Sequence, residues 1–193
     1  MDKQVCWNPK LKNAYISELK NTYEFLKHKF SLSREGVIPV HFFRLRPPNF
    51  PTIRLAQLAG VYSRRSNLFS SIIEAQSLEQ LYAIFEGSTS SFWNTHYTFE
   101  KSSKSSSKTL TKAFINLLII NTIVPIKFAF HKFNRYSNPD NVLAIIRNIP
   151  MEHNSIVDKF HSLYAFGKTA LDSQALIQLK HMYCSKNKCL QCA

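Results

Sequence analysis

Apolar side chains recur at intervals of three and four residues along much of the chain, which is the spacing of one face of an α-helix. Lysines fall on the other faces of the first such segment, residues 11–30, whose apolar positions are Leu11, Tyr15, Leu19, Tyr23, Leu26 and Phe30. Similar patterns predict helices over residues 77–86, 110–133, 141–148, 155–166 and 169–183. We therefore expect an all-α fold, a single helical domain of about six to seven helices followed by a Cys-rich C-terminal tail.

Two segments interrupt this pattern. Residues 41–46 are expected to be a short extended piece that leads into a stiff Pro-rich corner at residues 47–51. Pro51 suits the first turn of another helix, and the positions expected to face the core are Leu55, Leu58, Ala59 and Tyr62. Residues 101–108, KSSKSSSK, have the composition of a mobile loop.

Residues 113–130 are largely apolar and approach the length of a membrane span. They also contain Asn116, Asn121, Pro125 and Lys127, which are costly or disruptive in hydrocarbon. We interpret the segment as a buried central helix with a kink near Pro125, and we expect no membrane partner. The N-terminal residues lack a charged start followed by an apolar core, so we expect a cytoplasmic location.

The chain carries 25 Lys and Arg residues against 12 Asp and Glu, a formal net charge of +13. This excess favours a polyanionic partner such as nucleic acid, with an acidic protein as the alternative. It gathers in two zones without carboxylates, between Glu35 and Glu74 and between Glu100 and Asp140. In the second zone we expect Lys108 and Lys112 to bind anions.

The first basic zone contains an arginine corner. Arg44 and Arg46 alternate along the extended piece, and Arg54 lies in the first turn of the helix that starts at Pro51. Three guanidinium groups beside a helix N-terminus are suited to bind a phosphate. The alternative is that these arginines cap carbonyl groups or pair with carboxylates inside the fold.

Three of the four cysteines lie within the last ten residues, as Cys184-x4-Cys189-x2-Cys192. His181 precedes the first of them by less than one helical turn. Thiolates at such spacing commonly share a metal ion or an iron–sulfur cluster. We expect these four residues to hold zinc, with an iron–sulfur cluster or no metal as alternatives, and we divide the chain into a basic helical domain, residues 1–183, and a Cys-cluster tail, residues 184–193.

Five strings occur in this order: RLRPPNFPTIRLAQLAG (44–60), FWNTHY (92–97), INTIVPIKFAF (120–130), DSQALIQLK (172–180) and YCSKNKCLQC (183–192). Together they resemble the carboxy-terminal half of the bacterial family called domain of unknown function 2851. Members of that family are typically about twice as long, with an amino-terminal half loosely similar to nucleases. The resemblance implies an architecture and a Cys-bearing tail, but no reaction.

The sequence contains no Gly-x-Ser-x-Gly string, no phosphate-binding glycine loop and no close pair of carboxylates. We therefore do not expect this chain to be an enzyme on its own. The pattern favours a helical accessory domain that binds nucleic acid and is stabilised by a Cys-ligated metal. The alternatives are a structural or protein-interaction module, or the substrate-binding half of a nuclease-like enzyme whose catalytic half lies outside this chain.

Overall fold

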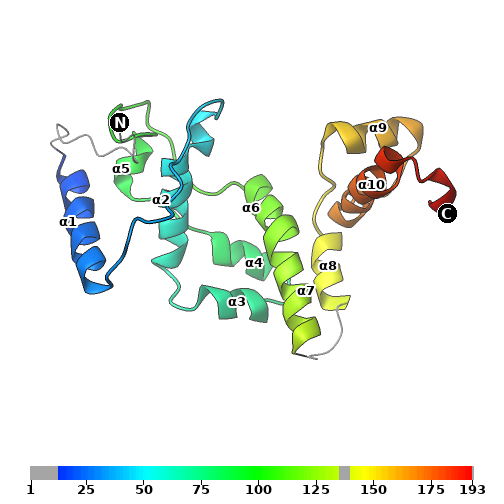
Figure 1. Ribbon diagram of the computed structural model, residues 1–193, viewed down its shortest axis with the longest axis horizontal. Helices are drawn as coiled ribbons and strands as arrows, with labels where there is room; N and C mark the ends of the chain where they lie inside the picture. The colour runs from blue at the N-terminus through cyan, green and yellow to red at the C-terminus, as the bar shows by residue number, and fades with distance from the viewer. Residues whose placement is uncertain (1–12, 135–139, 193) are drawn as a thin grey trace. The chain divides into compact units, whose positions relative to one another are not determined.

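The protein is all-α, as its periodicity predicts. The structure, a computed structural model, describes residues 13–134 and 140–192. Within these residues there is no β-strand, only two isolated bridges that join His96 to Ser102 and Pro150 to Thr169. The chain forms two compact units (Figure 1): unit 1 comprises residues 1–66 and 86–110, and unit 2 comprises residues 67–85 and 111–193.

Unit 1 contains α1 (Ala14–Lys29), the 3-10 turn η1 (Pro47–Asn49), α2 (Pro51–Tyr62) and the short α5 (Ser91–Asn94). The side chain of Asn13 caps α1 by accepting a hydrogen bond of 2.9 Å from the backbone nitrogen of Tyr15. The ring of Tyr15 stacks on Phe92, with centroids 4.6 Å apart, and its hydroxyl accepts a hydrogen bond from Trp93 Nε1. These contacts fix α1 against α5, and Trp93 is buried, as expected for a large aromatic side chain.

Helix α2 buries a different face from the one that its apolar pattern predicts. Its buried residues are Thr52, Ile53, Gln57 and Val61, whereas Leu55, Leu58 and Tyr62 are at least half exposed. Gly60 explains part of this rotation, because a Cβ atom there would lie 2.6 Å from the backbone oxygen of Ser88. The glycine lets α2 approach the backbone of residues 88–89. Ala59 is exposed as well, so the prediction that Leu55, Leu58, Ala59 and Tyr62 face the core is wrong.

The Ser-rich segment, residues 101–108, is held against α5 rather than forming a free loop. The backbone nitrogens of Ser103 and Ser106 donate hydrogen bonds to the carbonyl oxygens of Thr95, at 2.7 Å, and Asn94, at 2.9 Å. Composition alone predicts mobility here, but these bonds make the segment a fixed wall of unit 1.

Unit 2 contains the remaining elements: α3 (Leu68–Glu74), α4 (Leu78–Phe85), α6 (Lys112–Leu118), η2 (Ile119–Ile123), α7 (Val124–Phe133), α8 (Asp140–Arg147), α9 (Ser155–Leu163), α10 (Ala170–Met182), η3 (Cys184–Lys186) and η4 (Cys189–Gln191). Elements α6, η2 and α7 form one continuous helix (Figure 1). Its middle, η2, is a π-helical turn that ends at Ile123, two residues before Pro125. Because proline has no N–H to donate within the helix, the distortion expected near Pro125 takes this form.

The continuous helix, residues 112–133, buries one face. Ile115, Ile119, Ile120 and Ile123 lie in the core, whereas Ile126, Phe128 and Phe133 are exposed. Among the described residues, it is the one helix whose length and composition would suit a membrane span, and 28% of its apolar window is buried. The expectation of a central core helix therefore holds for one face only.

Lys127 is the buried charge of this helix, with 2% of its surface exposed. Its ammonium group donates hydrogen bonds of 2.9, 2.6 and 2.8 Å to the carbonyl oxygens of Ile72, Ile73 and Ala75. These carbonyls lie at the C-terminal end of α3, where helical carbonyls lack partners. Burial lowers the pKa of Lys127, and we assign the residue a structural role, joining α7 to α3.

Candidate functional site

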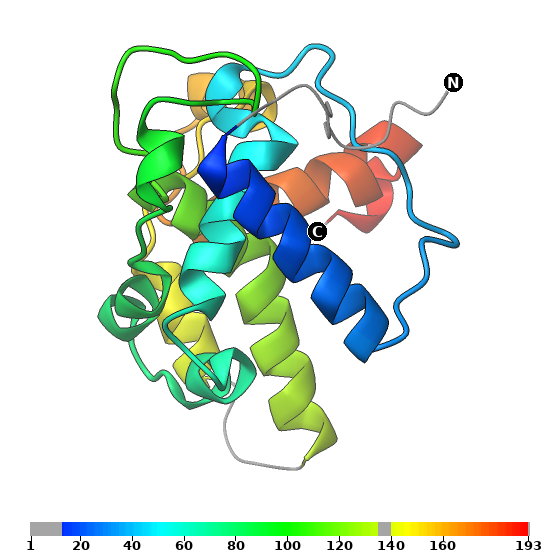
Figure 2. The same ribbon diagram turned by 90° about the vertical axis from the view of Figure 1, so that its left-hand side faces the viewer.

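The most exposed basic segment of unit 1 is the connection between α1 and α2, residues 31–50, which we call the basic loop. In Figure 2 it runs as a long segment from the end of α1 to the start of α2. Residues 41–46 form a turn, closed by a 3.2 Å hydrogen bond from the Leu45 nitrogen to the Phe42 oxygen, instead of the expected extended piece. The rings of Phe42 and Phe50 meet edge to face, at 5.1 Å, and anchor the loop beside η1.

Arg44 and Arg46 project from this loop and are both exposed. Within the described part of the chain, neither guanidinium group donates a hydrogen bond or lies within 4.0 Å of a carboxylate. The Arg44 guanidinium lies 5.1 Å from the ring centroid of Phe43, a side chain that is 80% exposed. The alternative that these two arginines pair with carboxylates inside the fold is therefore not realised among the described residues.

The backbone of Arg44 adopts a left-handed conformation, with φ of +63°. This conformation costs a non-glycine residue about 1 kcal/mol, so it persists only where the surrounding chain enforces it. Arg44 is the third residue of the Phe42–Leu45 turn, and Arg46 directly precedes η1, so the two arginines are displayed on a segment with a defined backbone.

Arg54 behaves differently from the other two arginines of the corner. It is partly buried, and its guanidinium donates hydrogen bonds of 2.9 Å to Gln57 Oε1 and 2.6 Å to Asn49 Oδ1. Burial lowers its pKa, although an arginine stays charged at every physiological pH. Arg54 thus links η1 to α2 and fixes the base of the basic loop.

A polar cluster, formed by Arg54, Gln57 and Lys108, connects α2 to the end of the Ser-rich segment. Gln57 Nε2 donates to the carbonyl oxygens of Lys108, at 2.8 Å, and Thr109, at 3.3 Å. The Lys108 side chain is 5% exposed, and its ammonium group donates to the carbonyl oxygens of Asn94 and Ser106 and to the Ser106 hydroxyl. Lys108 is therefore an interior residue, which corrects the expectation that it binds anions at the surface.

Tyr97 covers this buried ammonium group. Its ring centroid lies 4.0 Å from Lys108 Nζ, the geometry of a cation–π contact. A hydrogen bond with Ser106 lowers the pKa of Tyr97, and the charge of Lys108 acts in the same direction. The Tyr97 backbone oxygen accepts a 2.6 Å hydrogen bond from Thr52 Oγ1, so the cluster also holds the first turn of α2.

The two units differ in charge. The basic residues of unit 1 outnumber its carboxylates by twelve to five in the described residues; they are Lys20, Lys27, Lys29, Arg34, Arg44, Arg46, Arg54, Arg64, Arg65, Lys101, Lys104 and Lys108, against Glu18, Glu24, Glu35, Glu86 and Glu100. In unit 2 the corresponding balance is nine to six. Lys112, the remaining predicted anion ligand, is exposed in unit 2 and lies 5.5 Å from the ring of Tyr82.

The four residues predicted to bind a metal all lie at the C-terminal end of unit 2. His181 is in the last turn of α10, Cys184 begins η3, and Cys189 and Cys192 flank η4. None of the three thiols forms a disulfide, and no group of three or more His, Cys, Asp or Glu residues in the described residues is placed to hold a metal ion. Among residues 13–134 and 140–192, these donors are therefore not arranged as a zinc or iron–sulfur site, and the expected metal stays a prediction.

Sequence reasoning missed Gln57 and the interior role of Lys108. Gln57 interrupts the apolar stripe of α2, and a polar residue at a helical position is ordinarily assigned to the solvent face. Lys108 ends a run of serines and lysines that has no apolar pattern. Only their mutual contact in three dimensions identifies them as part of the core.

Comparison with other proteins identifies the family but offers no template for the site. No curated protein and no solved structure matches the chain. The family described as "Protein of unknown function (DUF2851)" matches residues 5–155. This span includes the basic loop and Lys108 and ends at the first residue of α9, before the cysteine tail. The chain therefore belongs to this family of proteins of unknown function.

Proposed function

We propose that unit 1 is a nucleic-acid-binding module, and that the basic loop is its contact surface. The observation that carries the proposal is the pair of exposed, unneutralised guanidinium groups of Arg44 and Arg46 beside the exposed ring of Phe43. Both arginines belong to unit 1, which has a marked excess of positive charge. Such a surface attracts phosphates from a distance and contacts them without first breaking internal ion pairs.

Phe43 favours single-stranded nucleic acid over a duplex. An exposed aromatic ring beside a cationic side chain is suited to stack on an unpaired base while the neighbouring charges contact the backbone. The bases of a duplex are already stacked on one another and are not available for this contact. Ile38 and Val37 lie in the same loop and are 81% and 66% exposed, which adds apolar surface for sugars and bases.

The polar cluster fixes the backbone at the base of the basic loop. Arg54 binds Asn49 in η1 and Gln57 in α2, and Gln57 binds the carbonyl oxygens of Lys108 and Thr109. Arg46 directly precedes η1, so its backbone is joined to this rigid base through Pro47 and Pro48. Lys108 and Arg54 are then positioning residues for the loop, and Arg44, Arg46 and Phe43 are the contact residues.

Binding of a fluorescent single-stranded oligonucleotide and its duplex, followed by anisotropy at two salt concentrations, tests the proposal. We expect salt-sensitive binding with Kd on the order of 10⁻⁶–10⁻⁴ M, typical of sequence-independent contacts. Phe43→Ala should weaken binding of the single strand by about 1–3 kcal/mol and leave duplex binding nearly unchanged. Absence of binding, or binding that salt does not weaken, contradicts the proposal.

An acidic protein partner is the second candidate, and the exposed apolar face of α2 favours it. Leu55, Leu58 and Tyr62 follow one another on this face and are 53%, 50% and 58% exposed. Apolar side chains flanked by cations are common at protein interfaces. A pull-down from nuclease-treated lysate, compared with Leu58→Ser, separates the two functions, because a protein contact survives the nuclease and depends on this face.

A further inference from the structure

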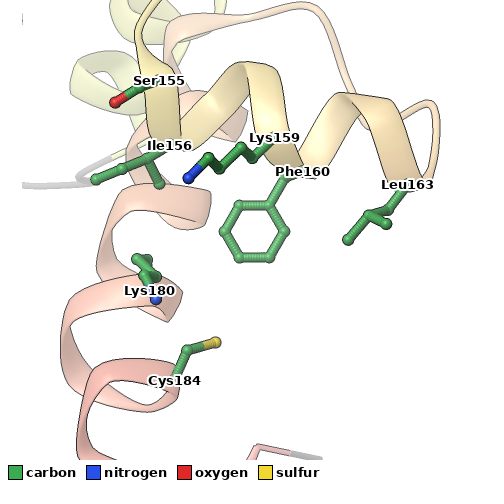
Figure 3. A pocket seen from close by; sticks show the side chains of 7 residues that line it. All are labelled: Ser155, Ile156, Lys159, Phe160, Leu163, Lys180 and Cys184. Atoms are coloured by element: carbon green, nitrogen blue, oxygen red, sulfur yellow. The ribbon is translucent and has the colours of Figure 1, made fainter.

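A pocket of about 240 Å³ lies between α9 and α10 in unit 2. Figure 3 shows Ile156, Phe160 and Leu163 of α9 along one wall, and Lys180 of α10 and Cys184 of η3 along the other. The Phe160 ring lies in the space between the two helices, and the Cys184 side chain lies below the ring, with its sulfur pointing away from its own helix (Figure 3). The pocket therefore has an apolar interior that is open to solvent.

The polar groups around this interior have one sign of charge. The Lys159 ammonium group extends from α9 into the space between the helices (Figure 3), and Lys180 lines the same pocket from α10. No carboxylate lines the pocket, and Asp158, the neighbour of Lys159, lies 3.7 Å from His153 Nδ1 instead. Within the described residues, neither ammonium group has a hydrogen-bonding or carboxylate partner, so both are available to a ligand.

We propose that this pocket binds a small aliphatic carboxylate, with the chain against Phe160, Ile156 and Leu163 and the carboxylate between Lys159 and Lys180. The apolar wall selects an aliphatic chain, because each methylene that is removed from water adds to the affinity. The paired lysines select an anionic end over a neutral or cationic one. The volume is below the roughly 300–1,000 Å³ of pockets for drug-sized ligands, which limits the occupant to a medium-length chain.

This inference is independent of nucleic-acid binding. The pocket residues all belong to unit 2, whereas the basic loop belongs to unit 1. The family match ends at Ser155, so the pocket lies almost wholly outside the matched span. Failure of either proposal leaves the other untouched, because their variants and probes do not overlap.

Cys184 supplies a reporter inside the pocket. Tryptic cleavage after Lys180, Lys186 and Lys188 places Cys184 alone on the peptide HMYCSK, and Cys189 and Cys192 together on CLQCA. The folded full chain is treated briefly with iodoacetamide, with increasing sodium octanoate, and alkylation of each peptide is measured by mass spectrometry. Because a ligand with so few atoms binds weakly, we expect protection at about millimolar octanoate. Octanoate should slow alkylation of Cys184 on HMYCSK several-fold and leave alkylation of CLQCA unchanged.

Two comparisons make the test specific. Octan-1-ol and octylamine carry the same chain without the negative charge, and both should protect Cys184 about three- to ten-fold less effectively than octanoate. Lys180→Gln and Lys159→Gln should each raise the octanoate concentration for half protection by about three-fold, whereas Lys168→Gln, which is outside the pocket, should not. Because Lys180→Gln removes one tryptic site, Cys184 is followed in that variant on the longer peptide TALDSQALIQLQHMYCSK. Equal protection by octan-1-ol, equal slowing of CLQCA, or no protection by octanoate would overturn the proposal.

Discussion

Gln57 Nε2 lies 2.8 Å from the carbonyl oxygen of Lys108, a hydrogen bond that spans 51 positions of the sequence. It joins the inward face of α2 to the end of the Ser-rich segment, and both partners are buried. This contact turns Gln57 inwards and leaves Leu58, its neighbour on the helix, exposed. The basic loop is therefore held by a polar cluster as well as by the contact between Phe42 and Phe50.

Gln57→Ala tests this polar cluster. The substitution leaves the carbonyls of Lys108 and Thr109 without their donor, and unsatisfied buried groups cost about 1–3 kcal/mol. We expect urea unfolding to give a free energy of unfolding lower by that amount. Leu58→Ala, on the exposed face of the same helix, should cost less than about 1 kcal/mol. If Leu58→Ala lowers the free energy of unfolding more than Gln57→Ala does, then α2 buries the face that periodicity predicts and not the face of Gln57.

Gly60→Ala tests the close approach of α2 to residues 88–89. Replacing a glycine inside a helix by alanine normally stabilises a protein by about 0.5–1 kcal/mol. Here the new methyl group would lie 2.6 Å from the Ser88 backbone oxygen, so we expect a loss of about 1–3 kcal/mol.

Gly87→Ala is the matched control, because the methyl group that it adds would have its nearest neighbours at 3.7 Å, an ordinary contact distance. It should change the free energy of unfolding by less than about 0.5 kcal/mol. If Gly60→Ala stabilises the protein in thermal or urea unfolding, α2 does not pack on Ser88 as described.

The N-terminus of α10 predicts a pH-dependent stabilisation. Thr169 and Asp172 form a capping box, and hydrogen bonds from the Thr169 side chain and backbone lower the pKa of Asp172. Because the folded state favours the ionised carboxylate, this stabilisation is complete above the unfolded pKa of about 3.9 and is lost as the pH falls through the folded value.

Asp172→Ala should therefore lower the free energy of unfolding by about 1 kcal/mol at neutral pH, and the difference from the parent protein should shrink in acid. Thr169→Ala, which removes the main cause of the shift, should weaken the same pH dependence. Urea titrations at a series of pH values measure both effects. A difference that stays constant into acid would mean that the Asp172 carboxylate does not act through its charge.

The arrangement of the tail predicts that Cys184, Cys189 and Cys192 do not hold a metal together. Metal analysis of anaerobically purified protein should then give much less than one zinc or iron per chain, and Cys→Ser substitutions at these positions should leave the metal content unchanged. One equivalent of zinc, lost in each of the three variants, would mean that the tail rearranges around the ion into the site that its spacing predicts.

Periodicity locates several of the helices because each buries apolar side chains at helical spacing. The segments predicted over residues 77–86, 141–148 and 169–183 correspond to α4, α8 and α10 within a few residues. Helix α3, of seven residues, is too short for its pattern to stand out, and the predictions do not include it.

The sequence misleads where polar groups and glycine decide the packing. The apolar pattern of α2 points to Leu55 and Leu58, whereas Gln57 and Gly60 face inwards because of partners that are distant in sequence. Lys108 resembles a surface cation because nothing near it in sequence reveals its carbonyl partners. Arg44 and Arg46 stand out because a run of cations without carboxylates is visible in sequence alone.

The central claim is that Arg44 and Arg46 contact phosphates, and a charge-matched comparison tests it most directly. The double variant R44Q/R46Q and the control K168Q/K186Q remove equal charge, from the basic loop and from unit 2 respectively. For a single-stranded oligonucleotide, R44Q/R46Q should reduce the slope of log K against log salt by about 1.4, and the control should leave the slope nearly unchanged. Equal slopes for the two double variants would contradict the claim, because binding would then follow net charge and not the basic loop.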